Sequence, residues 1–149
     1  MLRLSKKADY ALIAMKHLAL RRDHNSSARE IAELYDIPIE LLAKVLQRLV
    51  QRGLLLSQQG TRGGYQLART PALISIADVI QAIDGPVTVT ACTTDDGQCE
   101  QFAKCNVRDP LFRVRDRILS ALGECTIAEL ASDEPPPGTA RAAVFHTHV

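Results

Sequence analysis

Residues 27–53 read SAREIAELYDIPIELLAKVLQRLVQRG, and this stretch decides the fold. Ser27 followed three residues later by Glu30 is a capping-box pattern, which predicts that a helix begins after Ser27. Ile31 and Leu34 supply the apolar side of this helix, which we expect to run to about residue 35. The first half of the stretch therefore predicts one short helix with a clear start.

The second half of the stretch predicts another helix. Pro38 is placed to begin it, because the missing amide hydrogen would be unpaired in a first turn anyway, and Gly53 is placed to end it. Its apolar residues fall on one helical stripe, made of Leu42, Val45, Leu46 and Leu49. Two short helices joined by a tight turn are typical of a helix-turn-helix, although an ordinary helical hairpin gives the same pattern.

The outer face of this second helix carries side chains suited to DNA. They are Glu40, Lys44, Gln47, Arg48 and Gln51. If the helix enters a major groove, we expect Gln47 to read bases and Arg48 to bind phosphate.

A β-hairpin is predicted directly after this helix. The segments LLLS (54–57) and YQLA (65–68) are strand candidates, and the glycine-rich connection QQGTRGG joins them. Arg62 lies at the tip of the connection, placed to follow phosphates or to enter the narrow minor groove. A hairpin in this position makes a winged helix, and the alternative is an ordinary surface hairpin.

Further helices are predicted on both sides of this unit. Ser5 caps a helix over 5–21, with His17 at its surface and an apolar stripe made of Leu4, Ala8, Leu12, Met15 and Ala19. Ser75 caps a helix that runs to Ile83, and Thr126 with Glu129 begins a last short helix.

The helix expected over 110–122 has a narrow apolar seam between charged residues. The seam consists of Leu111, Val114, Ile118 and Leu122, which fits helix-to-helix association in a dimer, or packing on the helix's own domain. The sequence thus divides into a winged-helix DNA-binding domain (1–84), a cysteine-bearing loop (85–109), a dimerisation helix with a short C-terminal helix (110–131) and a disordered tail (132–149).

Charge is distributed unevenly along the 149 residues. Residues 1–69 carry 12 Lys and Arg against 6 Asp and Glu, whereas residues 70–149 carry 6 against 11. The basic front half favours a nucleic-acid partner, and a solvated basic surface is the alternative. No apolar run approaches the length of a membrane span, and the first residues lack the pattern of a secretory signal, so a cytoplasmic protein is expected.

Three of the four cysteines lie within the polar stretch ACTTDDGQCEQFAKCNVRD (91–109). Cys92, Cys99 and Cys105 are spaced Cys-x6-Cys-x5-Cys, which matches neither zinc knuckles, nor redox CxxC pairs, nor ferredoxins. Thiolates on one loop suit a soft metal centre. The chemistry therefore favours an iron–sulfur cluster first, zinc second and a disulfide switch third, with chance exposure of three thiols last.

Several segments together resemble one bacterial family. They are MLRLSKKADYAL (1–12), GTRGGYQLAR (60–69), ISIADVIQAIDGP (74–86), the three-cysteine loop and TIAEL (126–130). With these segments the chain resembles the iron–sulfur-dependent winged-helix transcription regulators, the IscR/NsrR-like family. The likeness covers residues 1 to about 131 and is strongest to regulators of the Suf cluster-assembly operon.

The resemblance implies a homodimer, a cluster near the dimerisation helix and DNA affinity that depends on cluster state. A 2Fe–2S cluster is expected in preference to 4Fe–4S. Assembly regulators place a histidine ligand where this chain has Arg108, which cannot coordinate iron. Nitric-oxide-sensing relatives use an acidic residue from the partner's first helix, and Asp9 matches that place, although a solvated carboxylate is an equal alternative. Cys125 is expected to be a partly buried residue rather than a ligand.

The wing also departs from the family pattern. Gln59 stands where an arginine usually precedes the first wing glycine, so we expect Arg62 to take over its role at the DNA.

Together these patterns predict a mainly α-helical fold with a small β wing. The function expected is that of a non-enzymatic, dimeric repressor, bound to double-stranded operator DNA and controlling cluster assembly or a redox or nitric-oxide stress response. The alternatives are a DNA-binding regulator with a structural zinc or thiol switch, and a small electron-transfer protein, which is disfavoured because the sequence shows no nucleotide loop or catalytic triad.

Overall fold

The computed structural model describes residues 3–89, 100–101 and 103–132, so the stretch of the cysteine loop that holds Cys92 and Cys99 and nearly all of the expected tail lie outside the described residues. Within these ranges the chain is mainly helical, with one two-stranded antiparallel sheet, as the sequence predicts. The elements in order are α1 (Lys6–Leu20), α2 (Ala28–Tyr35), α3 (Ile39–Gln51), β1 (Leu55–Gln58), β2 (Gly64–Leu67), η1 (Pro71–Leu73), α4 (Ile76–Asp84), α5 (Arg108–Glu124) and α6 (Ile127–Ala131). None of the helices in this part of the chain is long and apolar enough to cross a membrane.

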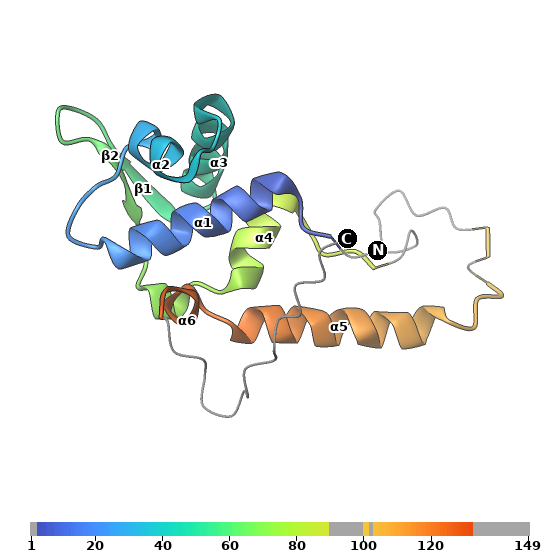
Figure 1. Cartoon of the computed structure of the whole chain (residues 1–149). Helices are drawn as coiled ribbons and strands as arrows, with labels where there is room; N and C mark the ends of the chain where they lie inside the picture. Colours follow the sequence, from blue (N-terminus) through green and yellow to red (C-terminus); the bar gives the residue numbers. More distant parts are fainter. Residues whose placement is uncertain (1–2, 90–99, 102, 133–149) are drawn as a thin grey trace, which may run out of the picture.

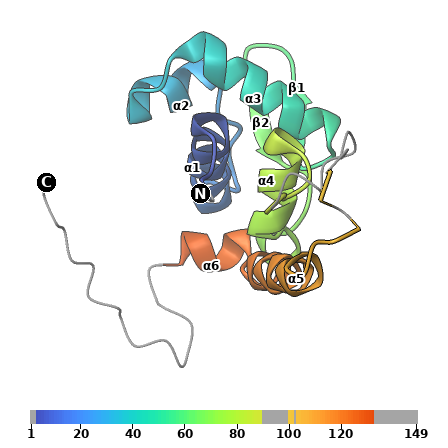
Figure 2. The ribbon, with the colours of Figure 1, turned by 90° about the vertical axis from the view of Figure 1, so that its right-hand side faces the viewer.

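Helix α1 lies at the centre of the fold, with α2 and α3 on one side and α4 and α6 on others (Figures 1 and 2). Ser5 caps it, as expected, by accepting a hydrogen bond from the backbone nitrogen of Ala8 at 3.1 Å. The predicted apolar stripe is only partly right, since Leu4 is 40% exposed and Leu12 is only half-buried. The fully buried positions are Ala8 and Met15 of that stripe, together with Ala11, Ala14 and Leu18, which the prediction did not include.

The helix-turn-helix forms as the sequence predicts. The Ser27 hydroxyl accepts from the Glu30 backbone nitrogen at 3.1 Å, and the Glu30 carboxylate accepts from the Ser27 nitrogen at 3.3 Å. The α3 stripe is buried at all four predicted positions, Leu42, Val45, Leu46 and Leu49. Leu34 was expected inside and is 55% exposed. Ile31 and Ala32 set the buried face of α2, and Leu34 lies roughly 110° around the helix from the centre of that face.

The wing is a short hairpin joined to the core at its base. β1 and β2 pair antiparallel, with Leu55 opposite Leu67 and Gln58 opposite Gly64, one residue away from the predicted strand limits. Beyond the hairpin, Ser26 and Tyr65 exchange backbone hydrogen bonds of 3.1 and 2.8 Å. This bridge attaches β2 to the loop between α1 and α2.

The C-terminal helices leave the core and return to it. α5 begins two residues before the predicted start, lies along α4 and buries none of its residues, and Figure 1 shows it extending past the other helices. α6 then packs against α1, with Ile127 fully buried in the core. The Ile127 nitrogen donates to the Ile74 carbonyl at 2.8 Å, and the Ile76 nitrogen donates to the Cys125 carbonyl at 2.8 Å. The structure therefore places α6 with the core of residues 1–84.

His17 was expected at the surface of α1, and this expectation is wrong. Its side chain is 4% exposed, because α1 is packed on several sides. Nδ1 lies 3.0 Å from the Tyr35 hydroxyl and Nε2 lies 3.2 Å from the Ser26 hydroxyl. The pKa of His17 is lowered from its ordinary value of 6.5, first by burial and then by Arg21, while Glu30 opposes the shift.

The lowered pKa predicts that His17 makes stability depend on pH. Below about pH 6.5 the unfolded chain binds a proton at this residue more readily than the folded protein does, so the free energy of unfolding falls as pH falls. Above that pH the residue is neutral in both states and contributes nothing to the slope. We expect the melting temperature to fall less steeply from pH 7 towards pH 5 in His17→Gln than in the wild type, whatever the other histidines do. If the melting temperature changes equally with pH in the two proteins, His17 is not a cause of the pH dependence of stability.

A second prediction concerns the close approach of the wing to the α1–α2 loop. Gly64 has φ +145°, and a Cβ there would lie 2.7 Å from the Ser26 carbonyl oxygen. Gly60 also has a positive φ, of +110°, but a Cβ there would meet nothing within 4 Å. We expect Gly64→Ala to lower the free energy of unfolding by about 1–3 kcal/mol more than Gly60→Ala does, measured by urea unfolding. A similar decrease in the free energy of unfolding in both variants would show that the Ser26 backbone shifts easily to accommodate a Cβ at position 64.

Candidate DNA-binding face and cysteine loop

The exposed face of α3 carries most of the predicted DNA-binding residues. Helical geometry places four of them opposite the buried stripe, and all four are exposed: Glu40, Lys44, Gln47 and Gln51. Two amides, one ammonium group and one carboxylate on a single helical face are able to donate to and accept from base edges in a major groove. The structure thus brings these side chains together, and their contact with DNA stays a prediction.

Arg48 lies at the flank of that face. Its Nε donates a hydrogen bond to the Ala82 carbonyl near the end of α4, at 3.2 Å. The side chain therefore joins α3 to α4 within the protein, a role that the helical pattern did not indicate. The phosphate contact expected for Arg48 stays a prediction, and this hydrogen bond already directs one nitrogen of its guanidinium group away from the outer face.

The wing tip is exposed and is held by a residue that the sequence analysis missed. Gln59 and Arg62 are both exposed, as a DNA contact requires. The Asn25 side-chain nitrogen donates to Gln58 Oε1 at 2.7 Å and to the Arg62 carbonyl at 3.1 Å. Asn25 belongs to a polar loop, and neither periodicity nor a cap pattern marks it, so no local signal could have found it.

The predicted metal ligands are only partly visible. Cys92 and Cys99 lie outside the described residues, and Cys105 is half-buried just before α5. Cys125 is exposed rather than partly buried as expected; it is the C-terminal cap of α5, and its backbone carbonyl accepts from the Ile76 nitrogen. Since α5 has 17 residues, it separates Cys105 from Cys125 by roughly 25 Å within one subunit. Cys105 and Cys125 of one chain therefore cannot ligate one cluster.

Asp9 and Arg108 occupy the two helix starts nearest this loop. Asp9 is half-buried in the first turn of α1. Just before it, the nitrogen and hydroxyl of Ser5 both donate to the Asp84 carboxylate, which fixes the start of α1 to the end of α4, where the cysteine loop leaves the core. Arg108 begins α5 and its Nε lies 3.2 Å from the Asp109 carboxylate. The described ranges contain no group of three His, Cys, Asp or Glu that could hold a metal.

The predicted dimer seam is accessible along α5. Leu111, Ile118 and Leu122 are half-buried and Val114 is 44% exposed. Beside the seam, a cavity of about 500 Å3 is lined by Ile118, Leu122 and residues of the α1 start and the α4 end. A long helix with an apolar seam and no buried residue is the pattern that a helix-pairing partner would complete.

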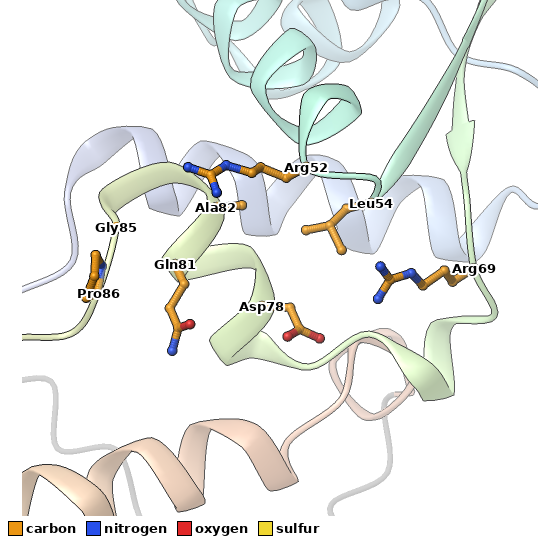
Figure 3. Close-up of a pocket in the computed structure, with 8 residues that line it drawn as sticks. All are labelled: Arg52, Leu54, Arg69, Asp78, Gln81, Ala82, Gly85 and Pro86. Carbon is orange, nitrogen blue, oxygen red and sulfur yellow. The ribbon is translucent and has the colours of Figure 1, made fainter.

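A second hollow lies between the end of α3 and α4 (Figure 3). It measures about 300 Å3, and its polar lining includes Arg52, Arg69, Asp78 and Gln81. The Asp78 carboxylate already accepts from the Ser75 nitrogen at 3.0 Å in the α4 cap. In the part of the chain that the structure describes, this hollow brings together no nucleophile with a base, so its lining fits a surface groove rather than a catalytic pocket.

Comparison with known proteins agrees with this geometry. The model of the Rrf2 family, described as an iron-dependent transcriptional regulator, matches residues 4–133. The HTH-type transcriptional regulator IscR of Xenorhabdus nematophila is 32% identical over 134 residues, covering 89% of this chain and 81% of that protein. Such relatives regulate transcription and are not enzymes.

Two solved structures share the fold. CymR, the global cysteine regulator of B. subtilis, superimposes with a TM-score of 0.72 and 29% identity, covering 91% of this chain and all of that chain. IscR of T. potens gives a TM-score of 0.71 and 26% identity, covering 94% and 93%. From the matched range, the identities and the shared winged helix, this chain belongs to the Rrf2 family of iron-dependent transcriptional regulators.

Proposed function

We propose that this protein is a homodimeric repressor whose affinity for operator DNA depends on an iron–sulfur cluster. The cluster ligands would be Cys92, Cys99 and Cys105 of one subunit and Asp9 of the partner subunit. The observation that carries the proposal is the position of the three-cysteine loop, which connects the end of the winged-helix core at α4 to α5. The regulated genes would serve cluster assembly or a redox or nitric-oxide stress response, as the sequence resemblance to such regulators implies.

The donor set fits a cluster better than it fits a closed zinc site. Three thiolates suit iron–sulfur ligation, and a carboxylate as the fourth ligand is harder and binds iron more weakly. When bound, such a cluster supplies a redox-sensitive and exchangeable group. Cys125 is excluded from the same subunit's cluster by the length of α5, which leaves the fourth position to another residue.

The DNA-binding role rests on the α3 face and the wing. In winged-helix proteins a recognition helix enters the major groove, and a wing-tip arginine fits the enhanced negative potential of a narrow minor groove. Here Lys44 and Gln47 lie at the centre of the exposed α3 face, and Arg62 is exposed at the wing tip. The basic balance of residues 1–69 supports attraction to phosphate.

The link between cluster and DNA would run through the dimer. α5 begins three residues after Cys105 and carries the apolar seam, while α4 joins both to the core. If two α5 helices pair, Cys105, three residues before α5, would lie next to the interface that sets the spacing of the two α3 helices. A change at the loop would then change how well both α3 helices fit two successive major grooves.

A second candidate keeps the DNA binding and replaces the cluster. The superposition on CymR, the global cysteine regulator of B. subtilis, favours a thiol-responsive or structural-zinc loop as the alternative. Iron and acid-labile sulfide content after purification without oxygen separates the two, because the zinc and thiol forms contain neither iron nor acid-labile sulfide. An electron-transfer function has no support among the transcription-regulator relatives.

The DNA-binding proposal predicts that Lys44 and Arg62 act together at the operator. We expect Lys44→Ala with Arg62→Ala to weaken binding of a duplex selected by the wild-type protein by about 1–3 kcal/mol for each base contact, and to lower the dependence of binding on salt for each phosphate contact. Fluorescence anisotropy at several salt concentrations measures both effects. Leu73→Ala is the matched control, because Leu73 is exposed and lies in η1, outside the wing and α3. Unchanged affinity in the double variant would contradict this docking.

The cluster proposal predicts that substitution of a loop cysteine removes iron and sulfide, whereas substitution of Cys125 does not. Cys99→Ala removes one of three thiolate ligands, so we expect it to lose most iron and sulfide after anaerobic reconstitution, whereas Cys125→Ala should keep the wild-type content. Elemental analysis and visible absorption provide the measurement. A full complement of iron and sulfide in Cys99→Ala would overturn the ligand assignment.

The same reconstitution tests the fourth ligand. Asp9→Ala is expected to retain a three-thiolate cluster that decays faster in air, with an altered absorption spectrum. Lys7→Ala is the control, because Lys7 is exposed and lies two residues away in the same first turn of α1. If Asp9→Ala matches the wild type in spectrum and decay rate, the fourth ligand is another group.

A further inference from the structure

The wing needs support from outside its own two strands. β1 and β2 have four residues each, and a two-stranded hairpin of this size is marginally stable alone. On one side the hairpin continues from α3 through Gly53, with Leu54 and Leu55 buried in the core. That attachment holds the base of β1, but it does not fix the direction in which the tip points.

The loop between α1 and α2 supplies the second attachment. At the base, the paired backbone hydrogen bonds of Ser26 and Tyr65 add the loop to the edge of β2. This approach requires Gly64, since a side chain at that position would collide with the Ser26 carbonyl. Behind the loop, the buried His17 lies within hydrogen-bond distance of the Ser26 hydroxyl, so the base rests on α1.

At the tip the attachment is made by one side chain. An asparagine amide nitrogen has two hydrogens, and Asn25 uses both, one on Gln58 Oε1 and one on the Arg62 carbonyl. Gln58 ends β1 and Arg62 lies in the turn before β2, so this amide joins the two sides of the hairpin where the strands end. Next to these bonds lies a cavity of about 500 Å3, lined by residues that include Asp23, His24 and Thr61, so the space between loop and tip is not filled by packed side chains.

We propose that Asn25 is a positioning residue for DNA recognition, which holds the backbone of Arg62 so that its guanidinium group reaches the DNA from a fixed direction. The proposal rests on the DNA-binding function proposed above. Asn25 itself needs no contact with DNA, because its two hydrogens are already used within the protein. Asn25 is proposed to act on affinity by fixing the direction of the wing tip. When that direction is fixed before binding, Arg62 enters a groove without a further loss of conformational entropy.

The test is a double-mutant cycle on the full chain, purified without oxygen, with the best duplex that the wild-type protein selects from a random double-stranded DNA library. We expect Asn25→Ala to weaken binding about three- to tenfold, while the melting temperature stays close to that of the wild type. Arg62→Ala should weaken binding at least as much, and the double variant should be no weaker than Arg62→Ala alone. His24→Ala is the matched control, because His24 is exposed and lines the same cavity.

The possible results separate this inference from the function on which it rests. If the wild-type protein selects no duplex, the DNA-binding proposal itself fails. If it does, and Arg62→Ala weakens binding while Asn25→Ala binds like the wild type, the positioning role is wrong. Strictly additive losses in the double variant would also overturn it, since Asn25 would then act on binding independently of Arg62. Wild-type affinity in Arg62→Ala would show that Arg62 makes no significant contact with DNA, and the positioning role proposed for Asn25 would then be wrong.

Discussion

The fold depends on how closely other elements approach α1. Ala8, Ala11 and Ala14 are fully buried, and their small side chains let α3, α4 and α6 pack against one helix. Larger side chains at these positions would have to displace the helix that each faces, because interiors are packed without spare volume. The helix-turn-helix, the base of the wing and the return of α6 therefore share one support, and the position of each is set relative to the same central helix.

Local chemistry predicted the elements well, and tertiary packing explains where it did not. The caps at Ser5, Ser27 and Ser75 are formed as expected, because a cap is satisfied by residues within one turn. The α3 stripe is buried because four large apolar residues share one face. For α1 the same reasoning gave too narrow a face, since alanine gives a weak periodic signal even when it is fully buried.

In the candidate site, too, local sequence predicts some features, and contacts between distant residues determine others. The exposed α3 face follows from helical geometry alone, and the sequence sufficed to predict it. The buried His17 contacts Tyr35, 18 positions further along the chain, and Arg48 donates to Ala82, 34 positions further along. Neither contact follows from local spacing. Asn25 is a similar case, because its partners lie 33 and 37 residues away and only the folded wing brings them to it. The iron–sulfur chemistry expected from the cysteine spacing stays a prediction, because Cys92 and Cys99 lie outside the described residues.

The return of α6 to the core gives α5 the mechanics of a lever. Its C-terminal end is pinned where residues 125–127 exchange backbone hydrogen bonds with residues 74–76, and its other end adjoins the cysteine loop. With a length of roughly 25 Å, a rotation of about 5° at the pinned end carries the far end about 2 Å. The half-buried Cys105 lies just beyond that far end, so the predicted thiolate ligand within the described residues sits where a given force produces the largest turn of the helix.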